Sequence, residues 1–583
     1  RPRPRTTRTA GTTASVRSDG SEGTVHEWLF RARRLLGVDD RATAYRREVE
    51  ALRGATARPT HDARLLDEMA RLAAAPDETL VAGETCAEPC IEVRMPFTEV
   101  AGRGHALVLG ASGSGKTRFV SGVVRDALRR IAHDHASMGL VVVDHKSEFV
   151  GLVRDLLRDL ARELPERAAR RLLDDLVVIN PFSAEALVPL QVLKAERGVA
   201  PEVQAYEVTA LINRMGGAEL GVRQDYFLYH LMLLCVLTDR SLVDAARLLD
   251  APEELTRAAA ACPSDEVQVF FAGGQRVGAQ SLEGVRARLH QLLRLPSARL
   301  MLGARDALSF RSLLASKIVL IDLGSAPRGC RDIAHFWAGL ITLKLTNAIF
   351  ERTPAEARRP VALFIDEWQE GLAAGGDLAE DYERVLSMAR SRGVSLWLIS
   401  QSLTGAARVS ASLPKVVATN TNAQFLFRAS AEDARAMAHL LSVTGRRPRP
   451  QPAPWEDRPR SPFLSSSEER EVLLDEIPSL PDRVFYYWNR RRPYRAVQLY
   501  AGEVAPRSAR ELGPREEWRL LHGALARPGA DLLRRRALRA RRSRHAPGPG
   551  ICQAFRRRHQ PARTRSGACR GRCLLPRRRT LGS

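Results

Sequence analysis

Short apolar runs that end in polar or charged residues recur through the middle of the chain, and each predicts a buried strand. These runs occupy residues 106–109, 140–144, 175–180, 317–323, 360–367, 394–402 and 423–428. Between several of them, apolar residues recur at three- and four-residue spacing, which predicts helices over 118–131, 332–352 and 382–392. Strands that alternate with helices are typical of a mostly parallel sheet. We therefore expect an α/β fold.

A long segment of different character interrupts this alternation. Over residues 200–301 the apolar residues keep helical spacing, as at Leu228 and Leu231, and runs of β-branched residues are few. We interpret this segment as an all-α domain inserted into the α/β domain. The α/β domain then comprises the two flanking parts, residues 79–199 and 302–445.

The remaining segments precede or follow the α/β domain. Residues 1–23, rich in Arg, Thr, Gly and Ser, predict a disordered basic N-terminus, and residues 24–78 predict helices. The Pro-, Arg- and Ser-rich stretch 446–480 predicts a linker. Residues 481–527 predict a β-hairpin and then a helix that returns to the α/β domain. For the arginine-rich residues 528–583 two interpretations stay open: a disordered tail that binds nucleic acid, or sequence that is not native.

The turn between the first of these runs and its helix carries the clearest chemistry in the chain. Residues 105–117 read His-Ala-Leu-Val-Leu-Gly-Ala-Ser-Gly-Ser-Gly-Lys-Thr, which matches the phosphate-loop pattern G-x-x-x-x-G-K-[ST]. Because the loop joins a strand to a helix, its backbone N–H groups can surround an anion. In this pattern the lysine reaches the β- and γ-phosphates, and the threonine hydroxyl ligates Mg²⁺. We predict an ATP site formed by Gly110, Ala111, Ser112, Gly113, Ser114, Gly115, Lys116 and Thr117.

Three other predicted strands end in side chains that suit the same site. One ends in Asp366 and Glu367; we predict that Asp366 holds Mg²⁺ through water and that Glu367 polarises the attacking water. Another ends at Gln401, whose amide can hydrogen-bond the γ-phosphate or the water. A third ends at Asp144, followed by Lys146 and Glu148, and ligands bind at the carboxyl ends of parallel strands, so we expect these three residues to face the nucleotide or a neighbouring subunit. An amide that caps the next turn and a solvated strand end are the alternatives for Gln401 and Asp144.

The positive charge of the chain is unevenly distributed. Its 583 residues carry a formal net charge of +23 at pH 7, and residues 531–583 alone hold 17 arginines against one acidic residue. Such a stretch attracts phosphate-bearing partners without specificity. No apolar run reaches the length of about 18 residues that a membrane-spanning helix needs. The nearest, 334–350, contains His335 and Lys344 and predicts a buried helix, so we expect no membrane span in this chain.

The order of the motifs resembles that of one superfamily of motor ATPases. The phosphate loop is followed by a strand ending in D-x-K-x-E at 144–148, by the helical segment, and by strands ending in I-D-E-W at 365–368 and I-S-Q-S at 399–402. Over residues 100–445 this order resembles the HerA–FtsK superfamily of hexameric pumping ATPases. Within that superfamily, the TraD/TraG-like coupling proteins of type IV secretion are the most similar.

The resemblance implies a RecA-like P-loop NTPase domain that forms a homo-oligomeric ring, a hexamer, which binds ATP and Mg²⁺ and draws DNA through its centre. It implies that an arginine of a neighbouring subunit completes each ATP site; Arg428 is the first candidate, and Arg390 and Arg392 are alternatives. The implied partners are relaxosome or type IV secretion components. The implied location is the cytoplasm, in association with the inner membrane through partners or through a segment that precedes Arg1.

The main functional interpretation is an ATP-driven DNA translocase that delivers DNA to a type IV secretion or conjugation machine. Three alternatives stay open: a soluble HerA-like ATPase of DNA processing or defence, an ATPase that pumps or remodels protein, and a scaffold in which bound ATP holds a ring together with negligible turnover. The presence of Lys116 and Glu367 argues against the scaffold. Stimulation of hydrolysis by DNA would distinguish the DNA motor from the protein pump.

Overall fold

The computed structural model describes residues 61–528, apart from 88, 103, 135–136, 184, 191, 195–197, 214, 216–219, 273–278, 305–307, 373–382, 439–440, 442–463, 503–511 and 525–526. The described residues belong to one unit of the chain, Arg1–Gly529. The disordered N-terminus, the first part of the helical segment and the arginine-rich tail that the sequence predicts lie outside the described residues.

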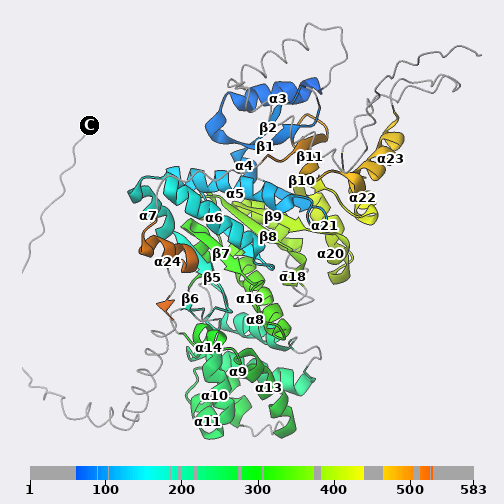
Figure 1. Ribbon diagram of the computed structural model, residues 1–583. Coiled ribbons are helices and arrows are strands. Elements are labelled where there is room, and N and C mark those ends of the chain that lie inside the picture. Colours follow the sequence, from blue (N-terminus) through cyan, green and yellow to red (C-terminus); the bar gives the residue numbers. More distant parts are fainter. Residues whose placement is uncertain are drawn as a thin grey trace, which may run out of the picture. The chain divides into compact units, whose positions relative to one another are not determined.

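Eleven strands of the described chain form one sheet, in the order β2-β1-β12-β11-β10-β3-β9-β8-β4-β7-β5. Strands β8 and β9 lie side by side in this sheet (Figure 1). From β10 to β5 all neighbouring strands run parallel. These seven strands are β3 His105–Leu109, β4 Gly139–Asp144, β5 Leu176–Ile179, β7 Ile318–Asp322, β8 Val361–Asp366, β9 Val394–Ser400 and β10 Thr421–Phe427. Each of the seven predicted apolar runs therefore forms a strand, and the α/β prediction is confirmed.

Four antiparallel strands extend the parallel part beyond β10. Strand β11 pairs with β10 and forms a hairpin with β12, which in turn pairs with β1, and β1 pairs with β2. The predicted hairpin within 481–527 is therefore an integral part of the sheet. These strands are β1 Thr79–Thr85, β2 Glu92–Pro96, β11 Val484–Asn489 and β12 Val497–Tyr500. A separate two-stranded sheet joins β6 Ala186–Leu187 to β13 Arg527–Pro528.

Helices cover both faces of the parallel strands, since every residue of β3, β4, β5, β7 and β9 is buried. The helices before the insertion are α3 Ala63–Ala73, α4 Phe97–Val100, α5 Lys116–His133, α6 Glu148–Glu163 and α7 Glu166–Asp174. Those after it are α15 Phe310–Ser316, α16 Arg331–Phe350, α17 Pro354–Ala357, α18 Gln369–Leu372, α20 Thr404–Val409, α21 Leu413–Asn420, α22 Ala431–Ala438, α23 Ser466–Glu476 and α24 Pro514–His522. Short 3₁₀ helices are η1 Pro76–Glu78, η2 Ala389–Arg392 and η3 Ile477–Ser479.

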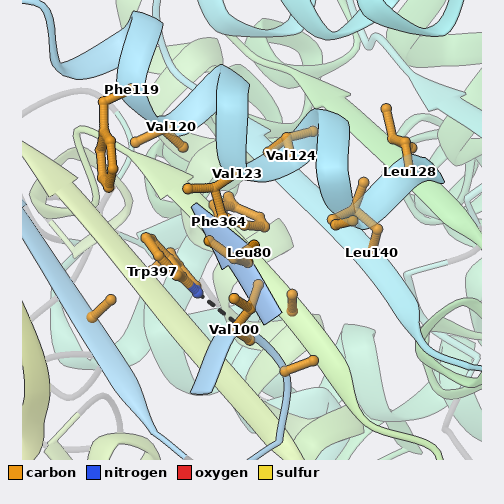
Figure 2. Packing of buried hydrophobic residues seen from close by; sticks show 14 of the residues in the cluster. Leu80, Val100, Phe119, Val120, Val123, Val124, Leu128, Leu140, Phe364 and Trp397 are labelled. Atoms are coloured by element: carbon orange, nitrogen blue, oxygen red, sulfur yellow. Dashed lines mark hydrogen bonds between the residues drawn. The ribbon is translucent and has the colours of Figure 1, made fainter. Parts of the chain in front are cut away.

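Helix α5 packs its apolar face on the middle of the sheet. Figure 2 shows its side chains over the sheet residues Phe364 and Trp397, whose ring centroids are 5.2 Å apart. The indole Nε1 of Trp397 donates a hydrogen bond of 3.1 Å to the carbonyl oxygen of Val100. Burial of each such apolar side chain contributes about 1.5–3 kcal/mol, and this packing fixes the start of α5 beside β3. The buried residues of α5 that the figure labels are Phe119, Val120, Val123, Val124 and Leu128.

Between Pro201 and Leu302 the described residues form helices and no strand. Helices α8 and α9 pack against each other, and α8 also contacts α16 of the α/β part. The spacing noted at Leu228 and Leu231 places both residues in a buried position of α9. These helices are α8 Pro201–Asn213, α9 Val222–Leu237, α10 Leu242–Asp250, α11 Pro252–Ala260, α12 Asp265–Ala272, α13 Ala279–Leu292 and α14 Pro296–Leu302.

Part of the stretch that the sequence analysis assigns to a linker is helical. Within 446–480, helix α23 begins after Ser465, whose hydroxyl accepts a hydrogen bond from the backbone N–H of Glu468. The Glu468 carboxylate in turn accepts one from the backbone N–H of Ser465, which completes a capping box. The serines that suggested a linker thus begin a helix. Residues 442–463 of that stretch lie outside the described residues.

One helix among the described residues has the length and composition of a membrane span. It is the segment Asp332–Phe350 of α16, with a mean hydropathy of 1.3, and 72% of it is buried inside the protein. A core helix meets the same criteria, and buried Lys344 of this segment donates a hydrogen bond of 2.9 Å to Gln204 of α8.

Candidate nucleotide site

The phosphate loop leaves β3 at the carboxyl edge of the parallel strands and enters α5. Its first residues are held between the neighbouring strands: the N–H of Gly110 donates to the carbonyl of Ser400 at 3.3 Å, and that of Ala111 to the carbonyl of Arg428 at 2.6 Å. Gly115 has a φ of +99°, a conformation that glycine adopts at little cost. The loop is therefore a fixed cradle between β9 and β10.

Lys116 is buried and folds back over this loop. Its Nζ donates hydrogen bonds to the carbonyl oxygens of Gly110 at 2.5 Å and Ala111 at 2.9 Å. Burial lowers the pKa of Lys116 to about 8, against the opposing effect of the nearby carboxylates of Glu367 and Asp366. The structure thus brings the predicted phosphate-binding lysine together with the predicted acidic pair.

Three aspartates end adjacent parallel strands in the same register. Asp366 of β8 lies opposite Asp144 of β4, and Asp144 lies opposite Asp322 of β7. Burial first, and then the charges of Asp144 and Glu367, raise the pKa of Asp366 to about 7, against the opposing effect of the two nearby lysines. Since these negative charges oppose ionisation of Asp366, a divalent cation beside it would favour the ionised carboxylate.

Glu367 is buried just after β8 in a left-handed conformation, with a φ of +47°. Its Oε1 lies 2.5 Å from Nζ of Lys146, and its Oε2 accepts a hydrogen bond of 2.7 Å from Nε2 of Gln369. The backbone N–H of Gln401 also donates to Oε2, at 3.4 Å. A positive φ in a residue with a side chain is strained and persists only where the surroundings hold it, as functional sites often do.

The carboxylate of Asp144 is wholly buried and engaged with the backbone. One oxygen accepts from the N–H of Lys146 at 2.7 Å, and the other accepts from the N–H of Val150 at 2.8 Å. Burial raises the pKa of Asp144, and these hydrogen bonds oppose the increase. In this structure Asp144 fixes the turn between β4 and α6, so the expected contact with the nucleotide stays a prediction.

A cavity of about 560 Å³ opens beside Glu367. The residues that line it include Lys146, Gln401, the loop after β7 and His335 of α16. None of residues 110–117 lines it, so the cavity adjoins the predicted phosphate site and is distinct from it. Gln401 thus both lines this cavity and contacts Glu367 through its backbone N–H.

The three arginines proposed to act in a neighbouring subunit have different positions. Arg428 follows β10, and its guanidinium lies 2.9 Å from a carboxylate oxygen of Asp482 in the same chain. Its carbonyl holds the phosphate loop through Ala111. Arg390 and Arg392 precede β9, at the amino edge of the parallel strands and therefore at the edge opposite the phosphate loop. The role of any of them in trans stays a prediction.

Two features beside the site were missed in the sequence analysis. Asp322 accepts hydrogen bonds from Ser147 at 2.5 Å and from Asn180 at 3.1 Å, and it completes the row of strand-ending carboxylates. The signal was present, because its predicted strand also ends in aspartate. The second feature is the segment 480–483, where the N–H of Arg483 donates to the carbonyl of Ser114 at 2.8 Å. No local pattern reveals a contact between such distant segments.

The residues present fit a nucleotide with Mg²⁺. Gly113 has a φ of +78°, and a Cβ added to it would meet no atom within 4 Å, so the loop leaves open space for an anion. The N-terminal N–H groups of the 18-residue helix α5 and the Lys116 ammonium provide positive potential beside it. Thr117, in the first turn of α5, and Asp366 are the residues that would hold Mg²⁺.

Among known proteins, only solved structures are similar to this chain. No protein-family model matches the chain, and no curated protein does. The bacterial conjugative coupling protein TrwBdeltaN70 is similar over 75% of this chain and 92% of its own, with 17% identity and a TM-score of 0.44. The plasmid coupling protein TrwB in complex with ADP and Mg²⁺ is similar over 72% and 89%, with 17% identity and a TM-score of 0.44. VirB4 of Thermoanaerobacter pseudethanolicus is similar over 73% and 96%, with 12% identity and a TM-score of 0.47.

Coupling proteins are the group that the order of motifs resembles.

Proposed function

We propose that this protein is an ATPase that couples ATP hydrolysis to the movement of DNA through a homo-oligomeric ring. The observation that most supports an ATPase is that Lys116, Asp366 and Glu367 lie at the same edge of the sheet, after strands β3 and β8, which have only β9 between them. A lysine, a metal-binding carboxylate and a base at one strand edge are the groups that phosphoryl transfer to water requires.

Different residues of the chain bind the phosphates and the Mg²⁺ ion. The loop N–H groups and Lys116 hold the β- and γ-phosphates, and Lys116 exchanges its bonds to the carbonyls of Gly110 and Ala111 for bonds to phosphate. Thr117 and Asp366 hold Mg²⁺. The ion, when bound, neutralises the negative charge that develops on the phosphate oxygens.

Glu367 acts on the attacking water. Its carboxylate accepts the proton of the water as the water oxygen bonds to the γ-phosphorus and the bond to the ADP oxygen breaks. Lys146 and Gln369 hold the two carboxylate oxygens, so the base has a fixed direction. The backbone N–H of Gln401 donates to Glu367, which places this residue beside the group that acts on the water, and its side-chain amide can hydrogen-bond the γ-phosphate or the water.

DNA is the proposed substrate because the order of motifs over residues 100–445 resembles that of DNA-pumping ATPases. The finer proposal is delivery of DNA to a type IV secretion or conjugation machine by a hexameric ring, in which Arg428 of one subunit completes the site of the next. For that role, Arg428 must exchange its contact with Asp482 for the phosphate of the neighbouring site.

The test is ATP turnover by the full chain with no DNA, single-stranded DNA or double-stranded DNA. We expect several-fold stimulation by DNA, and loss of turnover in Lys116→Ala and Glu367→Gln. The matched controls are Lys415→Ala and Glu432→Gln, which change exposed residues of α21 and α22 and should leave turnover unchanged. An ATP turnover rate that DNA does not change would favour a protein pump, and tight ATP binding without turnover would favour a scaffold.

A further inference from the structure

A short segment before β11 lies directly on the phosphate loop. Besides the 2.8 Å hydrogen bond from the N–H of Arg483 to Ser114, the backbone of Arg483 packs on Gly115. A Cβ added to Gly115 would lie 3.0 Å from the N, Cα and Cγ atoms of Arg483. The segment 480–483 is therefore a wall of the loop that precedes Lys116.

Arg428 contacts both this wall and the loop. Its guanidinium lies 2.9 Å from the carboxylate of Asp482 and donates to the carbonyl of Leu480 at 3.4 Å. Its own carbonyl accepts the N–H of Ala111 at 2.6 Å. On the other side, the carbonyl of Arg483 accepts the N–H of Ala501, just after β12, at 2.9 Å. The wall is thus built into the fold from both sides.

The backbone of Arg483 is strained. Its φ is +68°, in the left-handed region that favours glycine or asparagine. Its side chain is half-buried, and one guanidinium nitrogen donates to the Tyr500 hydroxyl at 3.4 Å. Backbone strain of this kind concentrates at ligand sites, so the positive φ makes Arg483 a candidate for contact with a ligand.

The order of strands decides which end of a nucleotide would meet this wall. Strands β9 and β8, which end beside Glu367, lie on one side of β3, and β10 and β11 lie on the other. A triphosphate in the loop must direct its γ-phosphate toward Asp366 and Glu367. Its nucleoside end then leaves the loop on the opposite side, where the segment 480–483 lies.

We propose that the base of the bound nucleotide packs on the segment 480–483 and that the planar guanidinium of Arg483 stacks on the face of the base. Guanidinium groups stack favourably on aromatic rings, and the strength of such a contact does not depend on the triphosphate. The proposal rests on the proposed ATP site and adds to it the residue that distinguishes a nucleotide from a bare polyphosphate.

The experiment compares the binding of MgATP and of magnesium tripolyphosphate, which lacks the nucleoside, to the full chain by calorimetry. The test variant is Arg483→Gly, because glycine keeps the left-handed backbone and its N–H bond to Ser114 while removing the guanidinium. Arg483→Ala is a second variant, and Arg495→Ala, an exposed arginine at the far end of the same hairpin, is the control. We expect Arg483→Gly to weaken ATP binding about tenfold, as loss of one stacking contact does, and to leave tripolyphosphate binding within about twofold.

Two results with Arg483→Gly would overturn this assignment. One is an equal loss of affinity for both ligands, which would mean that Arg483 acts only through the loop. The other is an unchanged affinity for both. If the wild-type chain bound tripolyphosphate and ATP equally well, no residue would recognise the base, and this inference alone would fail. If the wild-type chain bound neither ligand, or if Lys116→Ala bound both unchanged, the proposed ATP site would fail together with it.

Discussion

At the residue scale, two groups of the site have pKa values near neutral pH for related reasons. Burial lowers the pKa of Lys116 to about 8 and raises that of Asp366 to about 7, so both groups carry less charge than they would in water. A nucleotide with Mg²⁺ would supply the missing partners: phosphate beside the ammonium and a cation beside the carboxylate. Binding of a nucleotide with Mg²⁺ would therefore favour the charged form of both groups.

We predict that the Mg²⁺ concentration required for ATP turnover depends on pH. Because the pKa of Asp366 is raised to about 7, its carboxylate is ionised above that pH and protonated below it. The Mg²⁺ concentration for half-maximal ATP turnover should rise roughly tenfold from pH 8 to pH 6, in proportion to the loss of ionised carboxylate. The measurement is a Mg²⁺ titration of turnover at fixed ATP and several pH values. A requirement that is constant over this range would show that Asp366 does not hold the ion.

At the element scale, the turn after β4 is held against the loop after β7. A Cβ on Gly324 would lie 2.3 Å from the carbonyl carbon of Lys146 and 2.4 Å from the N of Ser147. These are backbone atoms of the turn that carries the Lys146 ammonium to Glu367. The ends of β4, β7 and β8 therefore form one unit. The position of the Glu367 carboxylate in it depends on close contact between the backbone of Gly324 and that of Lys146.

Two glycine substitutions test this coupling. Gly324→Ala should lower the free energy of unfolding by about 1–3 kcal/mol and reduce ATP turnover, because the turn must move and take Lys146 with it. Gly151→Ala is the matched control, since a Cβ at this helical position in α6 meets nothing within 4 Å. It should raise the free energy of unfolding by about 0.5–1 kcal/mol and leave turnover unchanged. Denaturant unfolding and turnover measure both effects, and equal behaviour of the two variants would contradict the account.

At the scale of the whole molecule, the C-terminal hairpin joins the sheet to the N-terminal elements. Arg492, in the turn between β11 and β12, forms an ion pair with Glu68 of α3 at 2.8 Å and another with Glu99 of α4. The amide of Asn489 also bonds to Glu99. Charged hydrogen bonds between segments this far apart in sequence fix the hairpin beside β10 and, with it, the segment 480–483 against the phosphate loop.

How much of this the sequence predicts depends on whether a feature is local. The seven parallel strands, the phosphate loop and the pair Asp366 and Glu367 follow from short patterns, because apolar runs and strand-end residues are local signals. The order of strands, the use of Asp144 as a turn cap and the contact of Arg483 with Ser114 do not follow, because they depend on pairing between distant segments. Helix α23 was not predicted, because serine-rich sequence is common both in linkers and at the N-termini of helices.

The central claim is that ATP hydrolysis moves the chain along DNA, and streptavidin displacement measures this most directly. The full chain is incubated with single- or double-stranded DNA that carries streptavidin on a terminal biotin, and release is followed with ATP, with ADP and with no nucleotide. We predict ATP-dependent release from at least one DNA form, and no release by Lys116→Ala or Glu367→Gln. Robust ATP turnover without displacement from either form, at either end, would contradict the claim.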